Sequence, residues 1–227
     1  MKKIIVLLIL LLPLLTSCAP SASSKLATPD WTKARSKPTP DLSGYQPNIE
    51  AFVVNEQCPH MCWLGINPGV TTPDEAKAAL AESDQIDPQM EITDTGIVAK
   101  WHTEKTKELT ASAYLRFDQG VIKSIAFSDM APFTLKNFID LMGDPSGINI
   151  DMNIYGDVME MPYGAYYFTR DVLVGAESAD QGLHPNDPVN SLVLNVPYKK
   201  ELFRLWVGYG GLAEYFKGKE VHEHPAP

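Results

Sequence analysis

The sequence predicts an α+β fold of tandem helix-plus-antiparallel-sheet units, with the helices packed on one side of the sheet. Two short stretches carry helix-start signals, and each is followed by segments in which apolar and polar residues alternate. Helices this short are unstable alone, so each must pack against a sheet. The order of helix and then strands occurs twice along the chain.

A repeated spacing supports the two-unit interpretation. Phe117 to Val121 and Phe168 to Val172 share the same order of an aromatic residue, a turn and a valine. We therefore expect one domain at residues 49–217, made of two similar units at about 58–130 and 131–217.

The first predicted helix begins at a capping box. Thr72 is the N-cap, Pro73 stands at the first helical position, and Glu75 closes the box. The helix should end near Ser83. Asp74 and Glu75 are acids in a first helical turn, where they complement the helix dipole, so they do not indicate a catalytic pair.

Strands are predicted on both sides of this helix. Residues 49–54 and 97–101 form short strand-like segments. Residues 111–117 and 121–127 alternate around a turn in which Gly120 can supply the left-handed position, which predicts a β-hairpin.

The second predicted helix spans Leu135–Met142, with Thr134 as its cap. Phe133 and Phe138 occupy the positions of a hydrophobic staple, and Gly143 fits the residue just after the helix. Residues 165–168 and 172–176 then predict a second hairpin. Residues 191–198 predict a further strand, and residues 199–206 a short helix.

The amino-terminal residues have the pattern of an export signal. Lys2 and Lys3 precede an apolar run from Ile4 to Leu15, which is too short to span a bilayer as a helix. The following Leu-Thr-Ser-Cys18 resembles the lipobox of bacterial lipoproteins. That resemblance implies removal of residues 1–17 as a signal peptide, and a diacylglyceryl group on Cys18 with further acylation such as palmitate. A plain cleaved signal and a retained transmembrane anchor are the alternatives.

Composition limits the partners. Loss of residues 1–17 removes two lysines and takes the formal charge from −9 to −11, which disfavours nucleic acid and anionic lipid. Residues 18–48 are rich in proline and serine and predict a flexible linker that spans about 30 Å. Residues 218–227 predict a flexible tail.

Cys58 and Cys62 form the densest local motif, Cys-Pro-His-Met-Cys-Trp. Their spacing differs from the two-residue spacing of zinc ribbons, thioredoxins and haem attachment. Because thiols oxidise outside the cytoplasm, we expect a Cys58–Cys62 disulfide with Trp63 packed beneath it. A redox-active pair, or a metal pair completed by His60, remains the alternative.

The stretch from Cys58 to Ala76 resembles a motif of uncharacterised, Chloroflexota-type bacterial lipoproteins, which can be written CPxxCWxGIxPGxTTxxEA. Its second half is similar to the first-helix entrance of small outer-membrane assembly lipoproteins of the SmpA/OmlA (BamE-like) type, and to β-lactamase-inhibitor-like (BLIP-like) domains. These resemblances imply protein binding through a sheet face and no catalysis. The chain departs from the small assembly lipoproteins by its two units and its cysteine loop.

Other candidate residues are scattered. His102 near Glu104, and His184 in a loop, are interpreted as ordinary surface histidines. His222-Glu223-His224 could bind a metal ion, but an unstructured tail is the simpler interpretation. A second group consists of four aromatic residues: Tyr163, Tyr166, Tyr167 and Phe168. Those that face solvent would form a contact patch.

The sequence holds no known catalytic, phosphate-binding or dinucleotide-binding motif. We assign no catalytic, metal-binding or cofactor-binding residue. The sequence therefore predicts a lipid-anchored, extracytoplasmic, non-enzymatic module at the cell membrane or outer membrane, which binds a protein partner or serves envelope assembly. A small-ligand or metal-binding envelope lipoprotein is the alternative.

Overall fold

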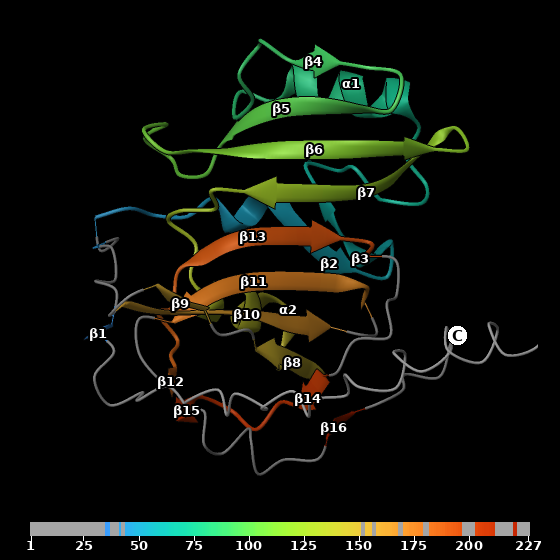
Figure 1. The fold of residues 1–227 in the computed structure, drawn as a ribbon. Helices are drawn as coiled ribbons and strands as arrows, with labels where there is room; N and C mark the ends of the chain where they lie inside the picture. Colours follow the sequence, from blue (N-terminus) through green and yellow to red (C-terminus); the bar gives the residue numbers. More distant parts are fainter. Residues whose placement is uncertain are drawn as a thin grey trace, which may run out of the picture. The chain divides into compact units, whose positions relative to one another are not determined.

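A twelve-stranded β-sheet dominates residues 33–227 in a computed structural model of the protein (Figure 1). Its strand order is β16-β14-β8-β10-β11-β13-β7-β6-β5-β4, and β1 and β9 also pair with β10. All strand pairs are antiparallel except β1 with β10, which is parallel. The structure describes residues 35–36, 41, 44–150, 153–155, 158–167, 170–178, 182–196, 203–211 and 220–221.

The elements have the following bounds. The strands of the large sheet are β1 (Arg35–Ser36), β4 (Glu91–Ile92), β5 (Gly96–His102), β6 (Thr110–Asp118), β7 (Val121–Ser128), β8 (Gly147–Ile150), β9 (Asn153–Tyr155), β10 (Val158–Tyr167), β11 (Val172–Ser178), β13 (Val189–Leu194), β14 (Phe203–Leu205) and β16 (Glu220–Val221). Two further pairs are β2 (Phe52–Asn55) with β3 (Cys58–Trp63), and β12 (Gly182–Leu183) with β15 (Gly210–Gly211). The helices are η2 (Ile49–Ala51), α1 (Pro73–Glu82) and α2 (Leu135–Met142).

The predicted α+β fold of tandem units is wrong. The described part of the chain is mostly β-sheet, with two α-helices, and most strands of both predicted units belong to one continuous sheet. The junction is the pairing of β7 with β13, in which Phe127 lies opposite Leu192 and Ala126 opposite Val193. Because about 60 residues separate these strands in sequence, local periodicity carries no sign of their pairing.

Most local predictions for this sheet are confirmed. The β6–β7 hairpin turns at Gln119 and Gly120, which have positive φ angles of 51° and 79°. Strand β5 and the β10–β11 hairpin also lie where they are predicted. Two details differ. Residues 49–51 form a 3-10 turn before β2, and Phe203–Leu205 is strand β14, where a helix is predicted.

Both predicted helices begin and end close to the expected residues. In α1, the backbone N–H of Thr72 donates to Glu75 Oε2 at 2.8 Å, and the Glu75 N–H donates to Thr72 Oγ1 at 3.3 Å. In α2, the Thr134 N–H donates to Asn137 Oδ1 at 2.8 Å. These bonds satisfy backbone groups that a helix end leaves unpaired.

A cluster of aromatic rings packs the β2–β3 hairpin and α2 onto one face of the sheet. Figure 1 places the hairpin and both helices behind the large sheet. Phe52 contacts four rings of the cluster at centroid distances of 5.4–5.9 Å, and Trp63 lies 4.9 Å from Phe127. The six rings are all buried: Phe52, Trp63, Trp101, Phe127, Phe133 and Phe138.

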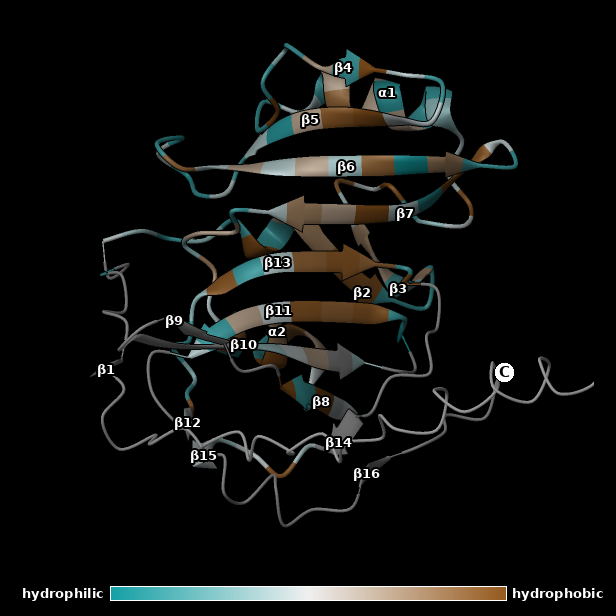
Figure 2. Cartoon of the chain, viewed as in Figure 1, coloured by the Kyte–Doolittle hydropathy of each residue, from teal (hydrophilic) through white to brown (hydrophobic). Residues whose placement is uncertain are grey.

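The strands alternate between buried residues on the covered face and more exposed residues on the opposite face. Along β6, Ala111, Ala113 and Leu115 are buried, whereas the residues between them are exposed. Figure 2 shows bands of differing hydropathy along β6, whereas β11 is mostly hydrophobic. The sheet therefore has one face covered by the hairpin and helices, and one face that no helix or strand among the described residues covers, which we call the open face.

We expect Phe52→Ala to lower the free energy of unfolding by about 3–5 kcal/mol, because it removes a ring in contact with four others. Val53 is the matched control, since it follows Phe52 on the same strand and is 39% exposed. Val53→Ala should change stability by no more than about 0.5 kcal/mol. Urea unfolding followed by tryptophan fluorescence measures both, and equal effects would contradict the cluster's central role.

Candidate functional site

The residues singled out in the sequence fall into different parts of the molecule. Cys18 and the tail residues His222, Glu223 and His224 lie outside the described residues, as do the side chains of Tyr166 and Phe168. The others occupy the cysteine loop, the loops at strand ends and the interior of the sheet, so the structure does not bring them together.

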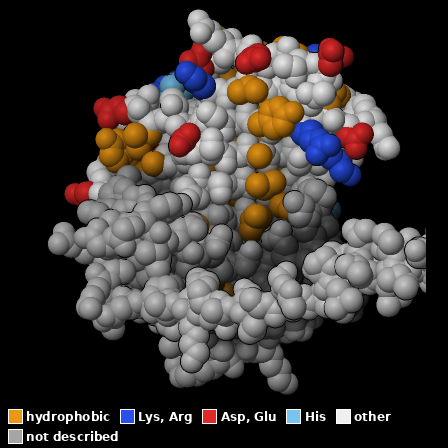
Figure 3. Space-filling view, viewed as in Figure 1, with side chains coloured by type: hydrophobic (Ala, Val, Ile, Leu, Met, Phe, Trp, Pro, Cys, Tyr) orange, Lys and Arg blue, Asp and Glu red, His pale blue; other side chains and the backbone are white. Residues whose placement is uncertain are grey.

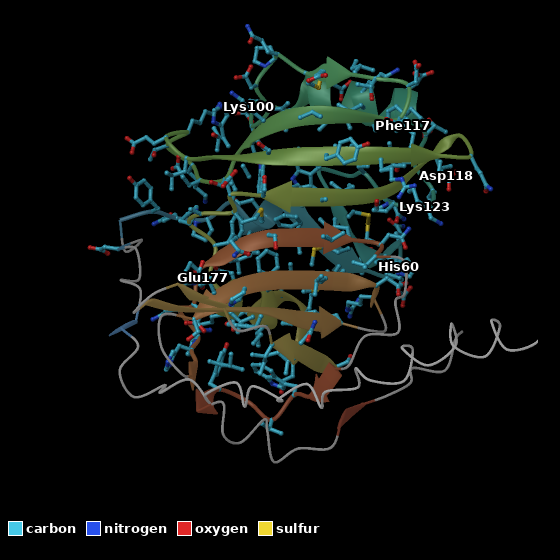
Figure 4. All side chains as sticks on the ribbon, viewed as in Figure 1. His60, Lys100, Phe117, Asp118, Lys123 and Glu177 are labelled. Carbon is cyan, nitrogen blue, oxygen red and sulfur yellow. A yellow bond between two sulfur atoms is a disulfide. The ribbon has the colours of Figure 1, made fainter. Side chains whose placement is uncertain are left out.

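The predicted Cys58–Cys62 disulfide is confirmed. Cys58 is half-buried and Cys62 is buried at the end of β3, and Trp63 next to it is fully buried in the aromatic cluster. The loop contacts the turn between β10 and β11. His60 Nδ1 lies 3.2 Å from the Arg170 carbonyl oxygen and 3.4 Å from Asp171 Oδ2. Figure 4 shows His60 at the same end of the strands as Lys123 and Asp118.

His102 and Glu104 serve the loop that follows β5. The buried carboxylate of Glu104 accepts hydrogen bonds from the backbone N–H groups of Thr106, Glu108 and Leu109, and from the Thr106 hydroxyl. Burial raises the pKa of Glu104, but these hydrogen bonds outweigh it and hold the pKa below its ordinary value. The backbone oxygen of His102 accepts from Asn48 Nδ2 at 3.2 Å. The carboxylate thus organises a loop and has its oxygens occupied.

His184 and Tyr163 contact another buried carboxylate, that of Asp187. Asp187 Oδ2 accepts from the Tyr163 hydroxyl at 2.8 Å and from the His184 backbone N–H at 2.9 Å. Tyr167 is also buried, and burial, together with Tyr209 and Asp144 nearby, raises its pKa. Tyr163 and Tyr167 therefore face the interior and do not form the predicted contact patch.

The described residues contain no group of three or more His, Cys, Asp or Glu side chains placed to hold a metal ion. In the same part of the chain, no helix is long and apolar enough to cross a membrane.

The most distinctive surface is a line of apolar side chains on the open face of the sheet. Five residues pair with one another across neighbouring strands, from β5 through β6, β7 and β13 to β11, and we call them the open-face row: Val98, Tyr114, Ala126, Val193 and Leu173. Val98 is 36% and Tyr114 39% exposed, and the other three are half-buried. Figure 3 shows an apolar strip that crosses the strands on this face.

Two glycines let large side chains of the open-face row lie against the sheet. A Cβ atom on Gly96 would stand 2.7 Å from the Tyr114 ring, and one on Gly164 would stand 2.7 Å from Leu173 Cδ1. The absence of a side chain at these positions therefore allows the Tyr114 ring and the Leu173 side chain to lie flat over neighbouring strands.

Small hydroxyl side chains border one side of the open-face row. Ser112, Ser128 and Ser191 pair across β6, β7 and β13, and the line begins at Lys100 on β5. On β11 it continues to Gly175, where Ser191 Oγ fills the place that a Cβ would take. This border supplies hydrogen-bonding groups next to an apolar strip.

Charged residues of both signs stand around the open-face row. Lys100, Arg116 and Lys123 are exposed, and their side chains form no ion pair in the described part of the chain. Glu91, opposite Val98, and Asp118, at the end of β6, add acidic groups at the margins. Figure 4 shows Lys100 and Glu177 toward one end of the strands, and Lys123 and Asp118 toward the other.

The open-face row was not predicted, although part of its signal is in the sequence. In the predicted strand 111–117, Ala113, Leu115 and Phe117 mark one face, and Tyr114 is an aromatic residue on the opposite, polar face. A single exposed tyrosine does not by itself indicate a binding surface. Its alignment with Val193 and Leu173 depends on the long-range pairing of β7 with β13.

A comparison with known protein families, with characterised proteins and with solved structures finds no match to this chain.

We expect Cys58→Ser/Cys62→Ser to lower the free energy of unfolding by about 2 kcal/mol, the chain-entropy value for so small a closed loop. Denaturant unfolding under oxidising conditions measures this loss. A dithiol should destabilise the wild-type protein by a similar amount and leave the double serine variant unchanged. A variant as stable as the oxidised wild type would show that the cross-link contributes nothing to stability.

Proposed function

We propose that this protein is a non-enzymatic, lipid-anchored module outside the cytoplasm that binds a protein partner through the open face of its sheet. The observation that carries the proposal is the open-face row, an apolar line across five strands that pair in register. An apolar centre with a polar rim is typical of protein–protein interfaces.

The surroundings of the open-face row favour a protein over other partners. Serine hydroxyls border it on one side, and basic and acidic side chains stand at its margins, as in an interface rim. A surface for nucleic acid or anionic lipid would carry an excess of positive charge. Here the whole chain has a net charge of −9, and the margins of the open-face row carry both basic and acidic side chains.

The residues around the open-face row also suggest how specificity could arise. Tyr114, at one of the two most exposed positions of the row, is an aromatic residue of the type enriched at binding hot spots. Lys100 and Arg116, on either side of it, would orient acidic groups of the partner. The apolar line would supply affinity, and the charges would set the direction of docking.

The membrane part of the proposal rests on the amino-terminal sequence. The charged start, the short apolar run and Leu-Thr-Ser-Cys18 support lipid attachment at Cys18. Two or three acyl chains would hold the protein firmly, since each buried methylene contributes about 0.8 kcal/mol. The proline-rich and serine-rich residues that follow would give the binding domain reach from the membrane.

Photo-crosslinking from Val98 tests the binding surface. Val98 and Val53 are both strand valines, 36% and 39% exposed, but Val53 lies on the β2–β3 hairpin and outside the open-face row. A photoreactive amino acid at Val98 or Tyr114, placed in the full chain in intact cells, should give the same discrete adducts. The same group at Val53 should give none of them.

Adducts that are equally strong from Val53, or absent from both Val98 and Tyr114, would contradict binding through the open face. In the same cells, Tyr114→Glu should reduce the adducts formed from Val98 by about tenfold, as expected for loss of a hot-spot residue. Thermal unfolding of this variant serves as the folding control, because Tyr114 lies outside the core.

Cys18→Ala tests the anchor. We expect this variant to leave the membrane fraction, and mass spectrometry of the wild-type amino-terminal peptide to show a diacylglyceryl group on Cys18. The Cys58→Ser/Cys62→Ser variant is the control for loss of a cysteine and should remain with the membrane. Membrane retention of Cys18→Ala would contradict lipid anchoring.

A further inference from the structure

We propose that the Cys58–Cys62 loop is a redox-sensitive clip that holds the turn between β10 and β11, and that a dithiol reductant releases it. The contacts of this loop are not confined to its own hairpin. They reach residues more than 100 positions later in the chain, at the end of two central strands of the large sheet.

The clip consists of three contacts between the loop and the turn. His60 Nδ1 lies 3.2 Å from the Arg170 carbonyl oxygen and 3.4 Å from Asp171 Oδ2. In the opposite direction, Arg170 Nη1 donates to the Pro59 carbonyl oxygen at 3.2 Å. These contacts are made by residues 59 and 60, which both lie inside the ring that the disulfide closes.

The disulfide restrains these residues, together with the fully buried side chain of Met61. Strand β2 pairs with Cys58 and Cys62, and the register shifts between the two pairs, so the residues between the cysteines lie outside the ladder. Met61 has a φ of 61°, a left-handed conformation that a residue with a Cβ rarely adopts. Without the cross-link, residues 59–61 could relax toward regular strand geometry, which would move His60 away from the turn.

The chemistry of release is an ordinary thiol–disulfide exchange. Cys58 is half-buried, whereas Cys62 is 1% exposed, so the attack falls on Cys58 Sγ. A thiolate of the dithiol bonds to Cys58 Sγ, and Cys62 leaves as a thiolate. The second thiol of the reductant then closes its own disulfide and frees Cys58. Two electrons and two protons pass to the protein, and the dithiol is oxidised.

The turn connects the clip to the rest of the sheet. The Asp171 carbonyl oxygen accepts a hydrogen bond from the Val196 N–H at 2.8 Å, just after β13. Leu173, two residues after Asp171, belongs to the open-face row. Release of the clip would therefore loosen one end of the row, a consequence that rests on the proposed binding function.

Hydrogen exchange of the full chain, with dithiothreitol as the reductant, tests the clip without any partner. Loss of a disulfide also lowers global stability and so raises the exchange rate of amides that exchange through global unfolding. The amides in the middle of β5 and β6 measure this global increase. Beyond this global increase, we expect the amides of Val172 and Val196 to exchange on the order of tenfold faster after reduction. If they accelerate only as much as the β5–β6 amides, the disulfide acts on the unfolded chain alone and the proposal is overturned.

The variant His60→Ala tests the contacts between the loop and the turn separately from the disulfide. With the disulfide intact, this variant loses two of the three contacts and keeps the bond from Arg170 Nη1 to the Pro59 carbonyl oxygen. It should therefore show part of the local acceleration at Val196, and the dithiol should add a smaller further increase there than in the wild type. Tyr114→Glu is the control, since it alters the open face and leaves the clip untouched, and it should respond to the dithiol as the wild type does. An unchanged dithiol response in His60→Ala would also overturn the proposal. Because none of these readouts involves the binding partner, failure of the clip and failure of the proposed binding function are distinguishable.

Discussion

Packing of the β2–β3 hairpin and α2 against a single face of the sheet organises this protein. Phe52 and Trp63 from the hairpin meet Trp101 and Phe127 from the sheet, and Phe133 and Phe138 from the start of α2 complete the cluster. Edge-to-face contacts among buried rings are specific in geometry and bury large areas. They hold together segments that lie as far as 86 residues apart, between Phe52 and Phe138.

The open face is a consequence of that packing. In the described part of the chain, the β2–β3 hairpin and both helices cover one face of the sheet. The residues that alternate with the core positions therefore lie on the other face. Most of them are serines or charged residues, as expected for a solvated sheet face. The open-face row departs from this expectation, and glycines at 96 and 164 let its large side chains lie flat. An apolar line within a polar surface is the feature on which the proposed binding function rests.

At one end of the strands, the cysteine loop contacts the β10–β11 turn. This contact connects the hairpin on the covered face to a strand that carries part of the open face. Trp63 anchors the hairpin in the aromatic cluster, and His60, three residues earlier, contacts Arg170 and Asp171. Two residues further along the chain, Leu173 belongs to the open-face row. The hairpin therefore contributes to the core with one end, and with the other it contacts the β10–β11 turn, next to one end of the open-face row.

Local features of this protein could be read from the sequence, because their causes lie within a few residues. The capping box at Thr72, the helix start after Thr134, the turn at Gly120 and the Cys58–Cys62 pairing all depend on neighbours in the chain, and all are confirmed. The tandem α+β architecture was wrong because the pairing of β7 with β13 is long-range, and alternation along a strand does not say which strand lies beside it. The same pairing aligns Ala126 with Val193, so the open-face row exists only in the folded chain. Sequence alone determined the two helices, the two hairpins of the large sheet and the cross-linked loop. Tertiary structure decided that the hairpins join into one sheet with an open face, since only folding brings distant strands into register.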